Sequence, residues 1–314
     1  MSRAVPTAFE LYFGSGRRDP WQLAELEELF FHSLGLRNGT RKTTCRHRLD
    51  DLNALLQQHL PPQRPLEIMD VAVSSGVSTA EWFESLERAA IECRMVAGDA
   101  VVDAFVISLG RLLRALVDRS GYLMQLELAG RAVRMPPPRR RDRIRYLPFI
   151  ALMKATTRLF GTALRTWDGT RPEPSSRLGV TCRPVKLMSL AVRRRHCIEA
   201  LEDDILVSGG HGRRFHVLRA ANILNRAYFD ARTLERMLVN LRARLRPHGL
   251  LIVCRTDDTG LNNATVFALE ADGRFRTLAR LNEGSEITDL VLRLPAWERR
   301  GAELHEPSLH TNSI

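Results

Sequence analysis

The sequence has few cysteines, and none of them lie close together. The five are Cys45, Cys93, Cys182, Cys197 and Cys254. An odd number at this spacing excludes a disulfide framework and the paired cysteines of a zinc site. Few, separated cysteines are typical of a protein in a reducing compartment. The histidines are dispersed as well, so the sequence indicates no metal site.

Long apolar runs are also missing. No stretch approaches the roughly 20 apolar residues of a membrane span, and the N-terminal segment MSRAVPTAFELYFGSGRRDPW has no apolar core of signal-peptide length. No repeat of solenoid period is visible. We therefore expect a cytoplasmic protein. A chain of 314 residues is long enough for one large domain or two modest ones.

The charge is far from balanced. The net charge is +11, and arginine dominates it. This excess is typical of a protein with a polyanionic partner or of one that binds an anionic membrane surface. It is equally typical of a proteome that uses arginine where others use lysine, so charge alone leaves the partner open.

Short apolar runs alternate with amphipathic patterns in two parts of the chain. The runs predict strands at 66–71, 94–97, 215–219 and 250–254, and the patterns between them predict helices at 79–90 and 231–246. This alternation is typical of a parallel sheet covered by helices. Two further runs, 264–269 and 275–281, are separated by Ala271-Asp272-Gly273 and predict a late antiparallel hairpin.

The same patterns divide the chain. We expect a helical cap at 1–62, a core at 63–102 and 191–298, an insertion at 103–190 and a polar tail at 299–314. Helices at 21–36 and 47–60 would form the cap.

The insertion carries the main sequence clue to an acceptor or partner. A predicted hairpin, 112–117 with 122–128, precedes the basic stretch PPPRRRDRIR and an apolar helix at 146–160. Residues 136–160 could contact an anionic membrane peripherally, form a lid over an apolar or lipid-like molecule, or bind RNA phosphates. They could equally pack against the sheet beside a solvated basic loop. Nucleic acid is the least favoured partner because aromatic residues make up only 6% of the chain.

The stretch DVAVSSGVSTAEWF follows the first predicted strand. It places Asp70, Ala72, Ser74 and Gly76 on the pattern acid-x-G-x-G-x-G. Small residues at these positions let a ligand approach the backbone closely, and the helix that follows offers free N–H groups. Ser78 and Glu81 have the spacing of a capping box for that helix.

Three further polar positions follow predicted strands in chain order. Asp99 lies about 20 residues beyond Gly76, where an acid can hold a pair of ribose hydroxyls. Asp203-Asp204 follows a strand-like run, and Asn222 follows the run at 215–219. Each has an ordinary alternative as a solvated acid, a turn or a helix cap.

With these residues the chain resembles the class I, Rossmann-like, S-adenosylmethionine-dependent methyltransferases over about 65–100 and 195–295. The resemblance implies an α/β fold with a doubly wound sheet, with S-adenosylmethionine as cofactor and S-adenosylhomocysteine as product. It implies that the loop from Asp70 wraps the methionine part, that Asp99 binds the ribose and that Asp203-Asp204 binds the adenine. The cofactor-binding residues it suggests are Asp70, Ala72, Ser74, Ser75, Gly76, Ser78, Thr79, Asp99, Asp203, Asp204, Ala220 and Asn222.

Two residues are candidates for the catalytic step. Methyl transfer from a sulfonium is an in-line displacement, for which the protein supplies orientation. Asn222 could orient the acceptor or hold the amino group of the cofactor. Tyr228 could donate a hydrogen bond, or it could pack beside Phe229. The chain has neither the Asn-Pro-Pro-Tyr signature of base-nitrogen methylation nor the paired cysteines of pyrimidine C5 methylation.

The segment 215–249 also resembles CheR-type protein methyltransferases, but it has Ala221-Asn222 where they have an Arg-Asn pair. We therefore expect methyl transfer to a small-molecule or lipid-like acceptor rather than glutamate methylation. RNA or protein methylation is the alternative. Because two of the three glycines are replaced, a non-catalytic binding protein with the same fold is another. A nicotinamide dehydrogenase is disfavoured by the late hairpin and by the acidic turn.

Overall fold

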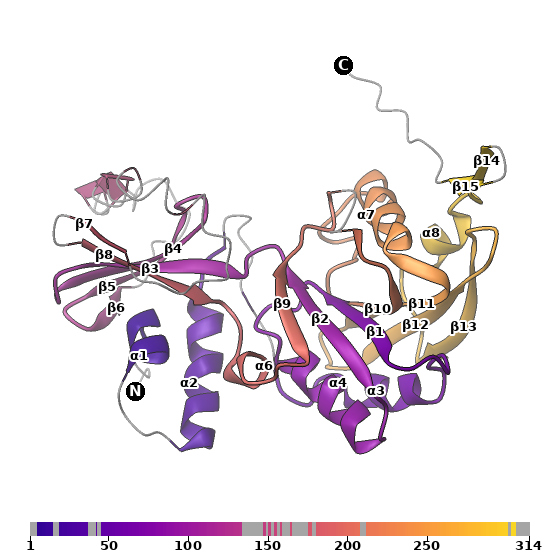
Figure 1. Cartoon of the computed structure of the whole chain (residues 1–314), viewed down its shortest axis with the longest axis horizontal. Helices are drawn as coiled ribbons and strands as arrows, with labels where there is room; N and C mark the ends of the chain where they lie inside the picture. Colours follow the sequence, from indigo (N-terminus) through magenta and orange to yellow (C-terminus); the bar gives the residue numbers. More distant parts are fainter. Residues whose placement is uncertain are drawn as a thin grey trace. The chain divides into compact units, whose positions relative to one another are not determined.

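In the computed structural model, the chain folds into two compact units (Figure 1). Unit 1 comprises residues 1–45 and 101–189, and unit 2 comprises residues 46–100 and 190–314. Residues 1–62, which the sequence suggested as one cap, are thus shared between the two units. The structure describes residues 5–14, 19–36, 42, 45–133, 147–148, 150–151, 154–155, 158, 164, 175–177, 180–207, 212–300 and 303–305.

Unit 2 is built on a seven-stranded sheet in the order β13-β12-β11-β10-β1-β2-β9. Five strands are parallel, namely β1 (Leu66–Val71), β2 (Cys93–Asp99), β9 (Ile198–Glu202), β10 (Phe215–Ala221) and β11 (Leu245–Thr256). The last two strands, β12 (Asn262–Leu269) and β13 (Phe275–Leu281), add on as an antiparallel meander. In chain order this is the 3-2-1-4-5-6 arrangement of doubly wound folds, extended by one strand, and it confirms the predicted fold class and late hairpin.

Helices cover both faces of this sheet. α3 (Asp50–Gln57) and α4 (Val77–Arg88) lie on one face, and α7 (Ala231–Ala243) and α8 (Thr288–Arg293) lie on the other (Figure 1). The short helix α6 (Leu190–Arg193) leads into β9, and β14 (Glu298–Arg300) pairs with β15 (Glu303–His305) after α8.

Alternation along β1 decides which face each side chain serves. Met69 and Val71 join the core formed with α7, which includes Leu234 and Leu238. Ile68 is buried and, with Asp70, points to the opposite face, where Asp70 receives a hydrogen bond from α4. The predicted strand 66–71 and the predicted helix 79–90 are confirmed within two residues at each end.

The predicted capping box at the start of α4 is wrong. The N-cap is Gly76, which has a left-handed backbone and makes no side-chain cap hydrogen bond. The carboxylate of Glu81 instead accepts the backbone N–H of His47, at 3.0 Å. Spacing alone could not exclude this long-range partner.

Unit 1 is a six-stranded antiparallel sheet in the order β6-β5-β4-β3-β8-β7. Its strands are β3 (Asp103–Leu109), β4 (Leu113–Asp118), β5 (Leu123–Leu128), β6 (Arg131–Val133), β7 (Ser175–Arg177) and β8 (Val180–Lys186). The predicted hairpin at 112–128 is confirmed as β4 and β5. The continuous apolar run of β3 is explained by burial on both faces, with Ala104 and Val106 in one core cluster and Phe105 and Ile107 in another.

The helices α1 (Ala8–Phe13) and α2 (Pro20–Ser33) cover one face of this sheet (Figure 1). Phe30, Phe31 and Leu34 of the α2 segment pack with Val106 and Leu116. The buried amide of Gln125 on β5 fixes the start of α1, because it accepts the N–H of Ala8 and donates to the carbonyl of Pro6.

None of the described helices combines the length and the apolar character that a membrane crossing requires. Most of the segment 136–160, for which the sequence predicted a basic stretch and an apolar helix, lies outside the described residues.

Candidate functional site

The strand order of unit 2 reverses between β1 and β10. From β1 the chain continues to β2 on one side, and the later strand β10 adds on the other side. In doubly wound sheets the crevice outside the carboxyl ends of the strands at such a switch point is the usual ligand site. The loop after β1, the ends of β2 and β9 and the loop after β10 all meet at this edge. The predicted cofactor residues lie in these loops and at the ends of these strands, except Ser78 and Thr79, which lie in the first turn of α4.

The loop after β1 has the backbone that the glycine pattern requires. Ala72, Ser74 and Gly76 have φ values of 56°, 61° and 76°, so all three are left-handed. This region costs a residue with a Cβ about 1–2 kcal/mol, and residues held there concentrate at functional sites. The loop is fixed to β2, since the N–H of Val73 donates to the carbonyl of Gly98 at 3.2 Å.

Asp99 lies against the same loop. Its carboxylate accepts the N–H of Ser74 at 2.8 Å, and only 8% of the residue is exposed. Its backbone carbonyl accepts the N–H of Asp203 at 2.9 Å. Asp99 therefore joins the ends of β1, β2 and β9.

Asp70 forms a buried ion pair that the sequence analysis missed. In the parallel register of β1 and β10, Asp70 is the partner of Arg219. The guanidinium donates to both carboxylate oxygens, at 3.0 and 2.6 Å, and both side chains are at least 96% buried. The signal was available, because an arginine within the apolar strand FHVLRAA needs a buried acceptor.

Further contacts saturate this pair. Arg219 also donates to Asn53 Oδ1 at 3.0 Å and to the carbonyl of Ser78 at 3.1 Å, and its guanidinium carbon lies 4.2 Å from the centre of the Trp82 ring. The hydroxyl of Thr79 donates to Asp70 at 2.7 Å. Thr79 and Ser78 thus support the Asp70–Arg219 pair, and Asp70 holds β1, β10 and α4 together.

The acidic turn after β9 is engaged in a similar way. The carboxylate of Asp203 accepts a hydrogen bond from Arg244, and both side chains are buried. Arg244 also donates to the carbonyls of Asp204 and Val207. Asp204 is exposed, and its carboxylate accepts the N–H of Leu206 at 2.9 Å. Arg244 is the second functional partner that sequence reasoning missed.

The loop after β10 carries both predicted catalytic residues, but only Asn222 is held there by side-chain hydrogen bonds, whereas the side chain of Tyr228 is exposed. Asn222 has a left-handed backbone, and its amide accepts the N–H of Thr256 at 2.7 Å and donates to the Thr256 hydroxyl at 3.3 Å. Ala220 is fully buried. Tyr228 is 69% exposed. Ser75 is buried at the turn of the first loop.

A cavity of about 560 Å³ lies at the opposite, amino-terminal edge of the same sheet. Three prolines and four basic or imidazole side chains line it, the latter being Arg214, His216, Arg246 and His248. His216 Nδ1 accepts the N–H of Glu67 at 3.0 Å. Burial, together with the charge of Arg246, lowers the pKa of His216, which keeps that nitrogen available as an acceptor.

The order and the register define a doubly wound α/β unit whose strand order reverses between β1 and β10. Comparison with known proteins gives no sequence match, either to a family model or to a curated protein.

Several solved structures are similar to this chain at low identity. The CMeT domain of the citrinin polyketide synthase is 13% identical, with a TM-score of 0.31 over 66% of this chain and 34% of that one. The N-methyltransferase NodS from Bradyrhizobium japonicum, solved with S-adenosylhomocysteine, is 13% identical, with a TM-score of 0.31 over 68% and 64%. The protein PH0226 from Pyrococcus horikoshii is 12% identical, with a TM-score of 0.34 over 82% and 86%.

The chain spans less than two thirds of the length of the first two of these proteins. TM-scores of 0.31 to 0.34 do not establish a common fold. The fold assignment therefore rests on the strand order and register of unit 2.

Proposed function

We propose that unit 2 binds S-adenosylmethionine at the carboxyl edge of β1, β2 and β10 and transfers its methyl group to a small-molecule or lipid-like acceptor. The observation that carries the proposal is the loop after β1. Its three glycine positions are left-handed even where the residues are Ala72 and Ser74. Residues with a Cβ adopt this backbone at a cost in free energy, and such residues concentrate at functional sites, so the loop is a candidate for ligand binding.

The residues at this edge fit the cofactor in part. The loop from Ala72 to Gly76 would receive the methionine part through its backbone, and Asp99, at the end of β2, would hold the ribose hydroxyls. Bound S-adenosylmethionine would supply an activated methyl group on its sulfonium sulfur. Asp70 and Asp203 do not fit as direct ligands, because Arg219 and Arg244 already bind their carboxylates. Their role is to position the loop and the turn.

Two features support the proposed transfer to a small-molecule or lipid-like acceptor. Asn222 is held against Thr256, so its amide is oriented rather than free to rotate, and Tyr228 presents an exposed hydroxyl from the same loop. The sequence of 136–160 places arginines beside an apolar segment, which suits an amphiphilic acceptor. Transfer to glutamate is not part of the proposal, since Ala221-Asn222 replaces the Arg-Asn pair.

A second candidate is a binding protein that retains this fold without catalysis. This second candidate is favoured by the contacts of Asp70. Arg219 and Thr79 already donate to its carboxylate, so the first acid of the loop has a structural role. Cofactor binding and turnover separate the two candidates.

The experiment is a calorimetric titration of the full chain with S-adenosylmethionine and S-adenosylhomocysteine. Asp99→Asn is the test variant, and Asp272→Asn, in the exposed β12–β13 turn, is the matched control. We expect saturable binding that Asp99→Asn weakens and Asp272→Asn keeps. Folded protein that binds neither compound would refute the proposal.

Turnover is then measured with labelled cofactor against amphiphilic metabolites, lipid vesicles, RNA and protein. Methylation of the first two supports the proposed acceptor class. Methylation of RNA or protein only would replace it, and binding without any transfer would favour the non-catalytic protein.

A further inference from the structure

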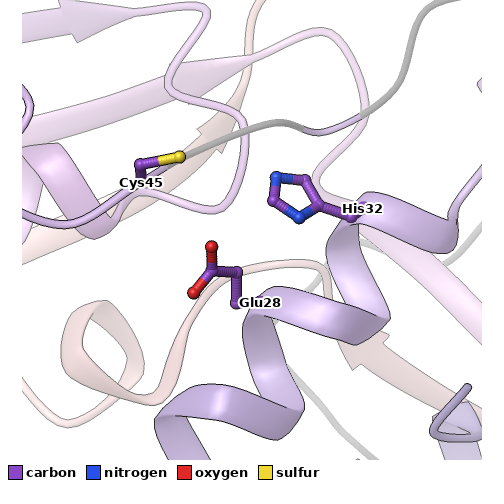
Figure 2. Close-up of side chains that lie close together, drawn as sticks. All are labelled: Glu28, His32 and Cys45. Carbon is purple, nitrogen blue, oxygen red and sulfur yellow. The ribbon is translucent and has the colours of Figure 1, made fainter. Parts of the chain in front are cut away.

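Three side chains of unit 1 that differ in chemistry converge on one point outside the site described above. Glu28 and His32 lie four residues apart on α2, so they share one face of that helix. Cys45 approaches them from the segment that follows. Figure 2 shows the Glu28 carboxylate, the His32 ring and the Cys45 thiol directed toward one another. One ligand atom from each lies within 4.8 Å of the other two.

The cluster is not explained by the packing of unit 1. Phe30 and Phe31, the neighbours of these residues on α2, are buried in the core, whereas Glu28 and Cys45 are exposed and His32 is half-buried. Among the residues that the structure describes, none forms a hydrogen bond or an ion pair with these three side chains. A carboxylate, an imidazole and a thiol thus meet without a partner among the described residues of unit 1.

This set of donors matches one metal ion better than others. A thiolate and an imidazole select zinc over magnesium or calcium, which prefer oxygen ligands. Ligand atoms bound tetrahedrally to one zinc lie roughly 3.5 Å apart, as follows from bond lengths of about 2.0–2.3 Å. Rotation of exposed side chains can close the remaining ångström or so without moving the helix.

We propose that Glu28, His32 and Cys45 bind one Zn²⁺, with a water molecule at the fourth tetrahedral position. Three protein ligands with one open position are the arrangement of an accessible zinc site rather than of a closed structural one. Binding breaks the S–H bond of Cys45 and forms a Zn–S bond, and the proton passes to the solvent. The metal joins residue 45 to the last turns of α2.

The sequence could not indicate this site. Its ligands follow the spacing Glu-x₃-His and then a single cysteine, so no cysteine pair marks them. The proposal is independent of the function proposed for unit 2, because none of its residues belongs to that unit.

The test uses the full chain stripped of metal with a chelator and then titrated with Zn²⁺ and with Co²⁺. We expect one ion per chain, release of a proton on binding and, with Co²⁺, a thiolate-to-cobalt charge-transfer band in the near ultraviolet. Cys45→Ser should abolish that band. His32→Gln should weaken binding by at least about tenfold, the lower limit found even for outer partners of metal ligands.

The chain supplies a matched control. Cys197 is the other exposed cysteine, so Cys197→Ser should leave the stoichiometry and the charge-transfer band unchanged. Glu28→Gln, at an exposed position, tests the carboxylate without risk to the core. The proposal would be overturned by the absence of binding, by several weak ions without the band, or by a band that survives Cys45→Ser.

Discussion

The buried pair between Asp70 and Arg219 makes the sharpest prediction about stability. The change is Arg219→Met, which keeps much of the side-chain volume and removes the charge. It leaves the Asp70 carboxylate 4% exposed with only the Thr79 hydroxyl among its side-chain donors, and it also removes the donors to Asn53 and Ser78. Breaking a buried ion pair from one side typically costs about 3–5 kcal/mol.

The expected loss can be converted into a melting temperature. In a domain of about 150–250 residues, 1 kcal/mol shifts Tm by about 2–4 °C, so we expect unit 2 to melt roughly 6–20 °C lower. The measurement is denaturant unfolding and calorimetry, with hydrogen exchange of the β10 amides to assign the transition to unit 2. Arg213→Met is the control. Arg213 is paired with Glu199 at the surface, and its loss should cost no more than about 1 kcal/mol.

A second variant keeps this reasoning testable. Replacing both partners, Asp70→Leu with Arg219→Met, removes the unpaired charge, so it should recover much of the loss. The reasoning is refuted if Arg219→Met costs under about 1 kcal/mol, or if the double variant is less stable than the single one.

Three further predictions concern the loop, the thiols and His216. Ala72→Gly and Ser74→Gly relieve left-handed backbone, so each should stabilise unit 2 by roughly 0.5–1 kcal/mol in urea unfolding, whereas Gly76→Ala should destabilise it. A loss of stability in the two glycine variants would contradict a left-handed backbone at Ala72 and Ser74. In native protein freed of metal, a thiol reagent should label Cys45 and Cys197 rapidly. Cys93, Cys182 and Cys254 should react only after unfolding, because burial raises their pKa values to about 11, 11 and 12. Rapid labelling of all five in folded protein would be the contrary result. Burial and Arg246 lower the pKa of His216, so the folded state resists protonation there, and stability should fall as the pH drops below 6.5. His216→Asn, which keeps an acceptor for the Glu67 N–H, should flatten that slope relative to His248→Asn, and an unchanged slope would exclude His216 as its source.

The sequence by itself determined the local elements and much of the class of fold. The apolar run at 66–71 predicted a strand, and the 3.6-residue pattern at 231–246 predicted a helix, which the structure has at Ala231–Ala243 with Asp230 as its N-cap. Alternation of such elements is typical of a parallel sheet covered by helices, and the two apolar runs on either side of 271–273 predicted a hairpin. The spacing of Asp70, Ala72, Ser74 and Gly76 predicted a loop that a ligand can approach closely, and the structure shows that its backbone is left-handed at Ala72, Ser74 and Gly76.

Only the tertiary structure decided which polar groups satisfy one another. Asp70 meets Arg219 because β1 and β10 are neighbours in the sheet, although 149 residues separate them in the chain. Asp203 meets Arg244, which lies at the end of α7, 41 residues further along the chain, and Cys45 lies beside Glu28 and His32 of α2. Periodicity reports which face a side chain serves but not which distant residue shares that face. The pairing of charges, and with it the division of acids into structural and ligand-facing ones, therefore came from the fold.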